Sequence, residues 1–202
     1  MKKLLFLSLL FGMIVSNARA LEVIKLPDPD IDENLSLYDA LINRHSVRFY
    51  EQKNLSRQTL SNILWVAYGV NREDGRRTIP TARNSKDLSV YVADKDGVWL
   101  YKAEKNELQQ VTEENIMYAF GSQPFMKDVP AVLIYTGSDK EHNFSVMHAG
   151  SAYQNVELYA GATKLGCVVR AMFDKEAVAK ALQLPVGQRV IVTQAIGYEK
   201  KE

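Results

Sequence analysis

Apolar residues recur along this chain at two different spacings, and the alternation of these spacings predicts a domain that mixes helices and strands. Helical spacing predicts a short helix after Ser36, a second after Ser56 that ends near Gly69, a long one over 145–165 and a last one over 175–182. Short apolar runs bounded by turn residues predict strands over 88–93, 98–102, 129–136, 168–170 and 189–197. The run over 129–136 is continuously apolar, which is typical of a central strand. The fold class expected from this order is α+β, with one domain over 36–202.

The segment before the first helix has a different composition. Residues 21–35 include an acidic, proline-containing run and are predicted to be an exposed lead-in without packed structure. Ser36 and Asp39 then form a capping box. Leu37, Ala40 and Leu41 share one face of the helix that follows, as core-facing residues do.

Residues 1–20 have the pattern of an export signal. Lys2 and Lys3 precede an apolar run of about twelve residues, and Ala18-Arg19-Ala20 has the small-x-small pattern of a cleavage site. The run is shorter than the roughly 20 residues that a membrane-spanning helix needs. We therefore expect Sec-type export to the periplasm or the cell exterior, with no membrane span in the mature chain. An uncleaved membrane anchor is the alternative.

Charge and cysteine content narrow the class of protein. The 202 residues include 25 Lys and Arg against 24 Asp and Glu, and three of the basic residues lie in the export signal. The mature chain is thus near-neutral to slightly acidic, which provides no general field for nucleic acid or an anionic membrane. Cys167 is the only cysteine, so no intramolecular disulfide can form, and we expect it to be a small buried residue.

Two short segments concentrate groups that bind phosphate and flat heterocycles. The first, 43–48 (NRHSVR), follows the first predicted helix. Its Arg44 can hold a phosphate bidentately, and the hydroxyl of Ser46 can add a hydrogen bond. The second, 80–84 (PTARN), presents the amide of Asn84, which offers both a donor and an acceptor. Phosphate at one end and a heterocycle at the other describe a bound mononucleotide, and a flavin is the prediction.

These segments resemble the FMN-binding motifs of the nitroreductase family, where an Arg-x-Ser-x-Arg segment precedes a Pro-Ser/Thr-Ala-x-Asn loop. The resemblance continues in family order through 87–97, 154–166, 167–171 and 194–198. The branch that it most resembles includes dehydrogenases that oxidise azoline rings as well as nitro-group reductases. The resemblance implies FMN as cofactor, a central mixed sheet flanked by helices, and an intertwined homodimer with the flavin at the subunit boundary. The small residues of 145–165 also suit close packing, in a core or a dimer interface.

The resemblance also implies roles for single residues. Arg44 and Ser46 match the phosphate-binding positions, and Arg48 matches the basic residue that faces the flavin pyrimidine. His45 matches a flavin-contacting position, although a structural hydrogen bond explains it equally well. The ordinary alternatives are compensation of the helix dipole for Arg44 and an ion pair with Glu51 for Arg48.

The second motif is assigned in the same way. Thr81 belongs to the loop motif, and Asn84 matches the residue that bonds the N3/O4 edge of the flavin ring. Its ordinary alternative is an Asx turn.

Two features depart from the family pattern. Many nitroreductases place a Glu-Gly or similar turn where this chain has Arg170-Ala171-Met172, with a backbone amide donating to flavin N5. We expect the backbone at Ala171 or Met172 to serve N5, with Arg170 near the flavin or substrate. The chain is also short beyond its closing Gly-Tyr, so the candidates for completing the phosphate site are Arg76, Arg77 and Lys200.

Other chemistries find little support. The three histidines are scattered, and one cysteine cannot complete a metal site, so no metal is expected. The chain has no dinucleotide-binding glycine motif, Walker loop or hydrolase elbow. We expect no catalytic side chain, because flavin N5 carries the chemistry in such enzymes.

The leading hypothesis is an exported FMN-dependent oxidoreductase that acts on a small organic molecule. Nitroaromatic or quinone-like acceptors are the default, and the electron donor is unidentified. Two alternatives stay open: a flavin-dependent dehydrogenase of a specific heterocycle or peptide, and a non-catalytic extracytoplasmic binding module.

Overall fold

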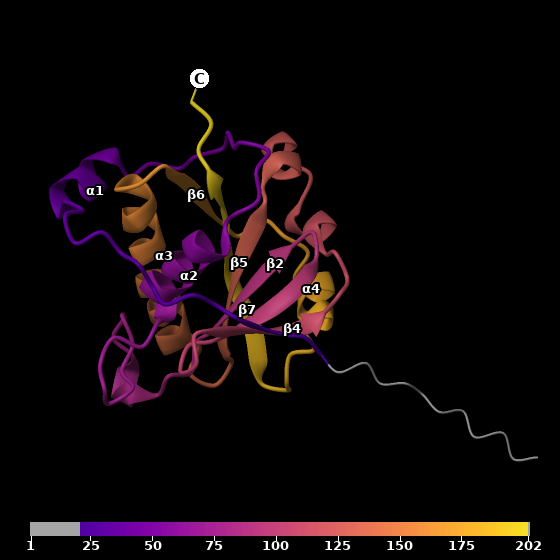
Figure 1. The fold of residues 1–202 in the computed structure, drawn as a ribbon. Coiled ribbons are helices and arrows are strands. Elements are labelled where there is room, and N and C mark those ends of the chain that lie inside the picture. The colour runs from indigo at the N-terminus through magenta and orange to yellow at the C-terminus, as the bar shows by residue number, and fades with distance from the viewer. Residues whose placement is uncertain (1–20, 202) are drawn as a thin grey trace, which may run out of the picture.

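The computed structural model describes residues 21–201, and a seven-stranded sheet runs through the middle of this part of the chain (Figure 1). Its strands are β1 (Val23–Lys25), β2 (Ser89–Asp94), β3 (Gly97–Lys102), β4 (Glu107–Thr112), β5 (Ala131–Ser138), β6 (Leu165–Arg170) and β7 (Gln188–Tyr198). They follow the order β1-β4-β3-β2-β5-β7-β6, and every neighbouring pair is antiparallel. A parallel bridge joins Ser46 to Cys167 at the β6 edge. The expected export signal lies outside the described residues.

Helices cover both faces of this sheet. They are α1 (Leu37–Asn43), α2 (Arg57–Tyr68), α3 (His142–Gly161) and α4 (Lys175–Ala181). Figure 1 shows α1, α2 and α3 together on one side of the sheet and α4 on the other. Ser36 and Ser56 cap α1 and α2 through their side chains, as the sequence predicts. The predicted α+β class with a central sheet flanked by helices is confirmed, but the strands of this sheet pair antiparallel where a mixed sheet was expected.

Alternating side chains divide the core into two halves. Val90 and Val92 of β2 lie in the core beneath α2 and α3, whereas Tyr91 and Ala93 lie in the core on the side of α4. Because both faces are covered, β5 is buried along nearly its whole length. Its continuous apolar run predicted this central position.

The segment 21–35 is not the unpacked lead-in that its composition suggests. It contributes β1, which pairs with β4, and Leu26 is buried in the core. Asn62 of α2 then holds Asp30, donating to its carbonyl (2.6 Å) and accepting from its N–H (2.9 Å). The acidic side chains of the segment are exposed, as predicted. Composition therefore indicated the exposed side chains but not the backbone pairing beneath them.

The apolar face of α1 points away from the core, which is a second correction. The one buried residue of this helix is Ala40, whereas Leu37, Tyr38, Leu41 and Ile42 are 65, 70, 56 and 66% exposed. Helical spacing shows which residues share a face, but not whether that face meets the core of the same chain.

The long helix ends earlier than predicted, and two strands were missed. α3 stops at Gly161, and β6 begins at Leu165. β1 and β4 had no prediction. Most of the small residues of α3, including Ala149, Ala152 and Ala160, are buried within the core of this chain. They therefore serve packing inside the chain.

Asn62→Ala should lower the free energy of unfolding by about 1–3 kcal/mol, because it leaves both backbone groups of Asp30 without their partner. Urea unfolding of the protein measures this. Asn34→Ala is the matched control, since Asn34 is exposed and its side chain bonds the nearby Asp32. The control should change stability by less than about 0.5 kcal/mol. Equal effects would show that Asn62 does not anchor the segment.

Candidate functional site

Residues 44–50 cross the free edge of the sheet directly against β6, and this contact positions the first predicted motif. The Val47 N–H donates to the Cys167 carbonyl, and the Lys200 N–H donates to the Phe49 carbonyl, both at 3.0 Å. Gly166 permits the close approach, since a Cβ there would lie 2.4 Å from Val47 Cγ1. The backbone that carries Arg44, Ser46 and Arg48 is thus fixed between β6 and the end of β7.

Arg44 lies at the C-terminal cap of α1 and forms an ion pair with Glu157 of α3. The distance from Arg44 Nη1 to Glu157 Oε2 is 3.1 Å, and the side chains are 39% and 6% exposed. A buried carboxylate without a partner is strongly unfavourable, so the pair holds both groups in place. A guanidinium has five N–H donors, and this contact leaves most of them available. Sequence reasoning missed Glu157, because a lone carboxylate on a helix matches no motif.

The neighbours of Arg44 are exposed. Arg48 forms no ion pair or hydrogen bond through its side chain with any residue in 21–201, so the alternative pair with Glu51 is not formed. The His45 ring donates from Nδ1 to the Asn43 carbonyl (2.7 Å) and contacts the Glu199 carboxylate at Nε2 (3.2 Å). The Asn43 bond, with a contribution from Glu199, raises the pKa of His45. These contacts are the structural hydrogen bonds that the sequence offered as the alternative to a flavin contact for His45.

The second motif forms a turn with unusual backbone angles. Arg83, Asn84 and Lys86 have φ values of 54°, 54° and 50°, which is the left-handed region that glycine usually occupies. The Thr81 hydroxyl accepts from the Lys86 N–H at 3.5 Å. The Asn84 side chain is exposed and makes no hydrogen bond within the described chain, so the alternative of an Asx turn is not formed. Its amide is free to bind a ligand.

The two motifs lie at different positions along α3. The first is tied to Glu157, and the second is tied to His148, whose Nε2 accepts from the Ala82 N–H at 2.7 Å. At 1.5 Å per residue, these two positions are about 14 Å apart along the helix axis. A ligand held by both motifs must therefore be elongated, as a mononucleotide with its phosphate and ring at opposite ends is.

Arg170 is buried and bonded within the chain, and its expected place near the flavin or substrate stays a prediction. Its side chain is 6% exposed. Nη1 donates to the Phe120 carbonyl, while Nη2 and Nε donate to Gln123 Oε1 at 2.8 Å and 3.2 Å. The guanidinium also lies 5.5 Å from the ring centre of Phe125. Burial lowers the pKa of Arg170. All these contacts are to the segment 117–128, which Arg170 holds against the end of β6. The next residue, Ala171, is exposed.

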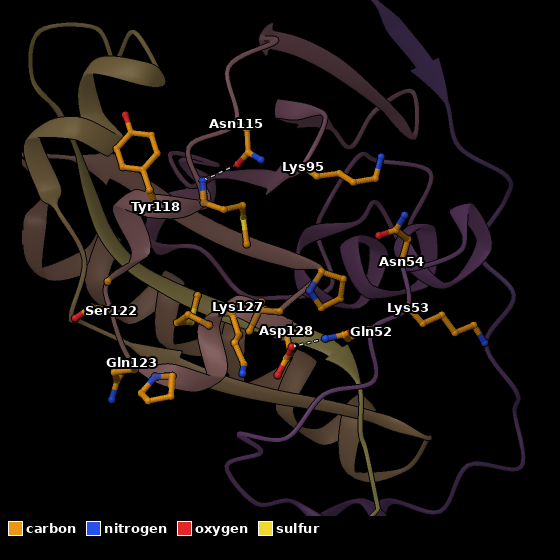
Figure 2. A pocket seen from close by; sticks show the side chains of 16 residues that line it. Gln52, Lys53, Asn54, Lys95, Asn115, Tyr118, Ser122, Gln123, Lys127 and Asp128 are labelled. Carbon is orange, nitrogen blue, oxygen red and sulfur yellow. Dashed lines mark hydrogen bonds between the residues drawn. The ribbon is translucent and has the colours of Figure 1, made fainter.

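Two cavities lie beside the segment 117–128. The cavity in Figure 2 has a volume of about 700 Å³, and its polar lining includes Lys53, Lys95 and Lys127. Across it, the Gln52 amide donates to the Asp128 carboxylate at 2.9 Å. No predicted site residue lines this cavity.

The second cavity, of about 970 Å³, shares Lys127 and Asp128 with the first and reaches the predicted site. Arg48 and Lys200 line it, together with the aromatic side chains of Phe49, Tyr50 and Phe125. Its volume is within the usual range for small-molecule sites. Lys200 is therefore the best placed of the three candidates for completing the site, since Arg76 and Arg77 pair with Asp74 and Glu104.

The remaining polar groups do not suggest another site. Cys167 is buried, as predicted, and burial together with the neighbouring Glu157 raises the pKa of its thiol. Within residues 21–201, no group of three side chains could hold a metal ion. The described helices include none that is long and apolar enough to cross a membrane.

Comparison with known proteins identifies the family. Residues 41–198 match the nitroreductase family, and the chain belongs to it. A relative from Methanocaldococcus jannaschii, MJ1384, whose name carries a provisional nitroreductase assignment, is 33% identical over 189 residues, covering 80% of this chain and 95% of its own length.

Solved structures agree with this assignment. A provisional nitroreductase of Ralstonia eutropha JMP134 superposes with a TM-score of 0.82 at 29% identity, covering 89% of this chain and 90% of that one. An FMN-dependent nitroreductase of Clostridium difficile R20291 shares the fold, with a TM-score of 0.59 at 18% identity over 82% of this chain and 88% of its own.

Arg170→Met should lower the free energy of unfolding by roughly 2–4 kcal/mol, because hydrogen bonds to a charged group are lost and the Phe120 carbonyl loses its partner. Arg189→Met is the matched control. Arg189 is exposed and lies 3.6 Å from Asp139, a surface pair worth at most about 1 kcal/mol. Thermal and urea unfolding measure both variants. If Arg170→Met instead left stability unchanged, the structural role would be wrong.

Proposed function

Starting from this family membership, we propose that the chain is an FMN-dependent oxidoreductase that transfers two electrons to or from a small organic substrate. The observation that carries the proposal is the state of Arg44. Buried Glu157 fixes its guanidinium, yet the side chain is 39% exposed and keeps most of its donors free. A cation held rigidly at the surface suits a phosphate, because little entropy is lost when the anion binds.

The other exposed donors complete an elongated site. In this proposal Arg44, Ser46 and Lys200 bind the phosphate, and the amide of Asn84 bonds the pyrimidine edge of the ring. The charge of Arg48, which has no partner of its own, stabilises negative charge on that ring. Ala171 is exposed just after the end of β6, and its backbone would offer a further contact. FMN itself supplies the hydride chemistry, so no nucleophilic side chain is needed.

The substrate would bind in the cavity of about 970 Å³ beside Arg48. Its aromatic side chains, Phe49, Tyr50 and Phe125, suit a flat molecule, and nitroaromatic or quinone-like acceptors fit this description.

We also propose that the working form is a homodimer in which a second copy covers α1. Four of the seven residues of α1 are large, apolar and more than half exposed. Contiguous apolar surface of this kind marks an interface. Since α1 runs directly into Arg44, a second copy there would lie next to the proposed phosphate site.

Removing Arg44 should weaken FMN binding by roughly tenfold to a hundredfold, the equivalent of one charge-assisted hydrogen bond or more. Arg44→Ala alone would leave Glu157 buried without a partner. The comparison is therefore between Glu157→Gln and the double variant Glu157→Gln/Arg44→Ala, with affinity measured by the quenching of flavin fluorescence. Riboflavin is the control ligand, because it lacks the phosphate and should bind both variants equally. A loss that is the same for riboflavin and FMN would refute the phosphate role.

Light scattering should give twice the chain mass for the protein without residues 1–20. Ile42→Glu places a charge on the exposed face of α1 and should yield monomers. Val186→Glu is the matched control, since Val186 is a fully exposed apolar residue outside the helices. The homodimer proposal fails if the unmodified protein is a monomer that still holds FMN.

A further inference from the structure

His148 of α3 links the partly buried carboxylate of Asp87 to the backbone of the proposed flavin loop. Its Nδ1 lies 2.8 Å from Asp87 Oδ1, and its Nε2 lies 2.7 Å from the Ala82 nitrogen. A backbone N–H can only donate, so Nε2 must be the bare acceptor. Nδ1 therefore carries the proton and donates it to Asp87. The contacts fix His148 as a neutral imidazole in a single tautomer.

Asp87 is itself held on several sides. The hydroxyl of Ser145 donates to its Oδ2 (2.8 Å), and that of Ser85 donates to its Oδ1 (2.9 Å). Burial acts to raise the pKa of Asp87, but the hydrogen bonds from Ser145, Ser85 and His148 outweigh it and lower the pKa. Asp87 is thus an ionised acceptor at neutral pH. Among the described residues, Asp87 is the titratable group whose side chain contacts the His148 ring.

The loop that His148 holds would not keep its shape without support. Three of its residues, Arg83, Asn84 and Lys86, have left-handed backbone angles that persist only where surrounding contacts enforce them. The bond from Ala82 to His148 is a direct connection from this loop to the rigid helix α3. This bond therefore helps to position the Asn84 amide, together with the contact of Arg83 with the Phe144 ring of α3.

We propose that His148 is a positioning residue that makes flavin binding sensitive to protonation. The neutral ring accepts from Ala82 and holds Asn84 toward the ligand. The protonated ring presents a second N–H to the Ala82 N–H, so two donors face each other and the loop is released. Protonation meanwhile strengthens the pair with Asp87, so the ring stays on Asp87 while the loop departs. The inference rests on the proposed function, because Asn84 is the residue whose placement changes.

The test compares FMN affinity at pH 8 and pH 5.5 in the unmodified protein, His148→Gln and His142→Gln. The unmodified protein should lose at least about tenfold in affinity over this interval, in which histidines change charge. His148→Gln should bind more weakly at pH 8 and lose less affinity on acidification, since an amide does not titrate there. His142→Gln is the matched control on the same helix, because His142 Nδ1 is buried without a partner, and it should follow the unmodified protein. Ionisation of the phosphate acts on all three proteins alike, so the difference between them isolates His148.

A measurement on the flavin-free protein separates this inference from the proposed function. In NMR spectra of the unmodified protein, the Ala82 amide resonance should move together with the titration of the His148 ring, and protection of 81–86 from hydrogen exchange should fall. An Ala82 amide that ignores this titration, or a His148→Gln profile identical to that of the unmodified protein, would overturn the inference. Absence of FMN binding at both pH values would instead refute the proposed function and leave the NMR result to decide the role of His148.

Discussion

The candidate site depends on how closely residues 40–50 approach α3 and the sheet. Added methyl groups at Gly161 and Gly166 would lie 2.6 Å from the Ala40 carbonyl and 2.4 Å from Val47. Real Cβ atoms do not make such contacts, so the segment lies where it does because these side chains are absent. Moving it outward by the width of a methyl group would separate Arg44 from Glu157 and break the backbone bonds to β6. The position of Arg44, the pairing of its segment with β6 and the orientation of α1 thus all depend on the absence of side chains at Gly161 and Gly166.

The helix α3 determines how far apart the two predicted motifs lie. Two of its buried polar side chains, Glu157 and His148, each hold one predicted motif, and the helix fixes the distance between them. Burying polar groups is unfavourable unless each is hydrogen-bonded, and here both are. These contacts explain why α3 carries a carboxylate and an imidazole on its buried side. They also make the site rigid on the protein side, while the groups intended for the ligand remain exposed.

The sequence predicted local features well and long-range ones poorly. Capping at Ser36 and Ser56 and the central position of β5 follow from nearest neighbours, and they were predicted correctly. The pairing of β1 with β4, the buried Arg170 and the partner of Arg44 depend on residues far away in the chain. No spacing rule contains that information. For α1, periodicity placed Leu37, Ala40 and Leu41 on one core-facing side, but Ala40 is buried whereas the two leucines are exposed.

The exposed face of α1 connects assembly with ligand binding. Ile42 is exposed two residues before Arg44, and the other donors of the proposed site, Ser46, Arg48 and Asn84, are exposed as well. A second copy that covered α1 would exclude water from the neighbourhood of Arg44 and strengthen its attraction for a phosphate. Binding free energies are reciprocal, so a phosphate bound at Arg44 would stabilise the covered state by the same amount. In the proposed dimer, flavin binding and subunit association are therefore a single coupled equilibrium. A chain that neither binds flavin nor associates would leave the apolar face of α1 and the cations of the site exposed to water.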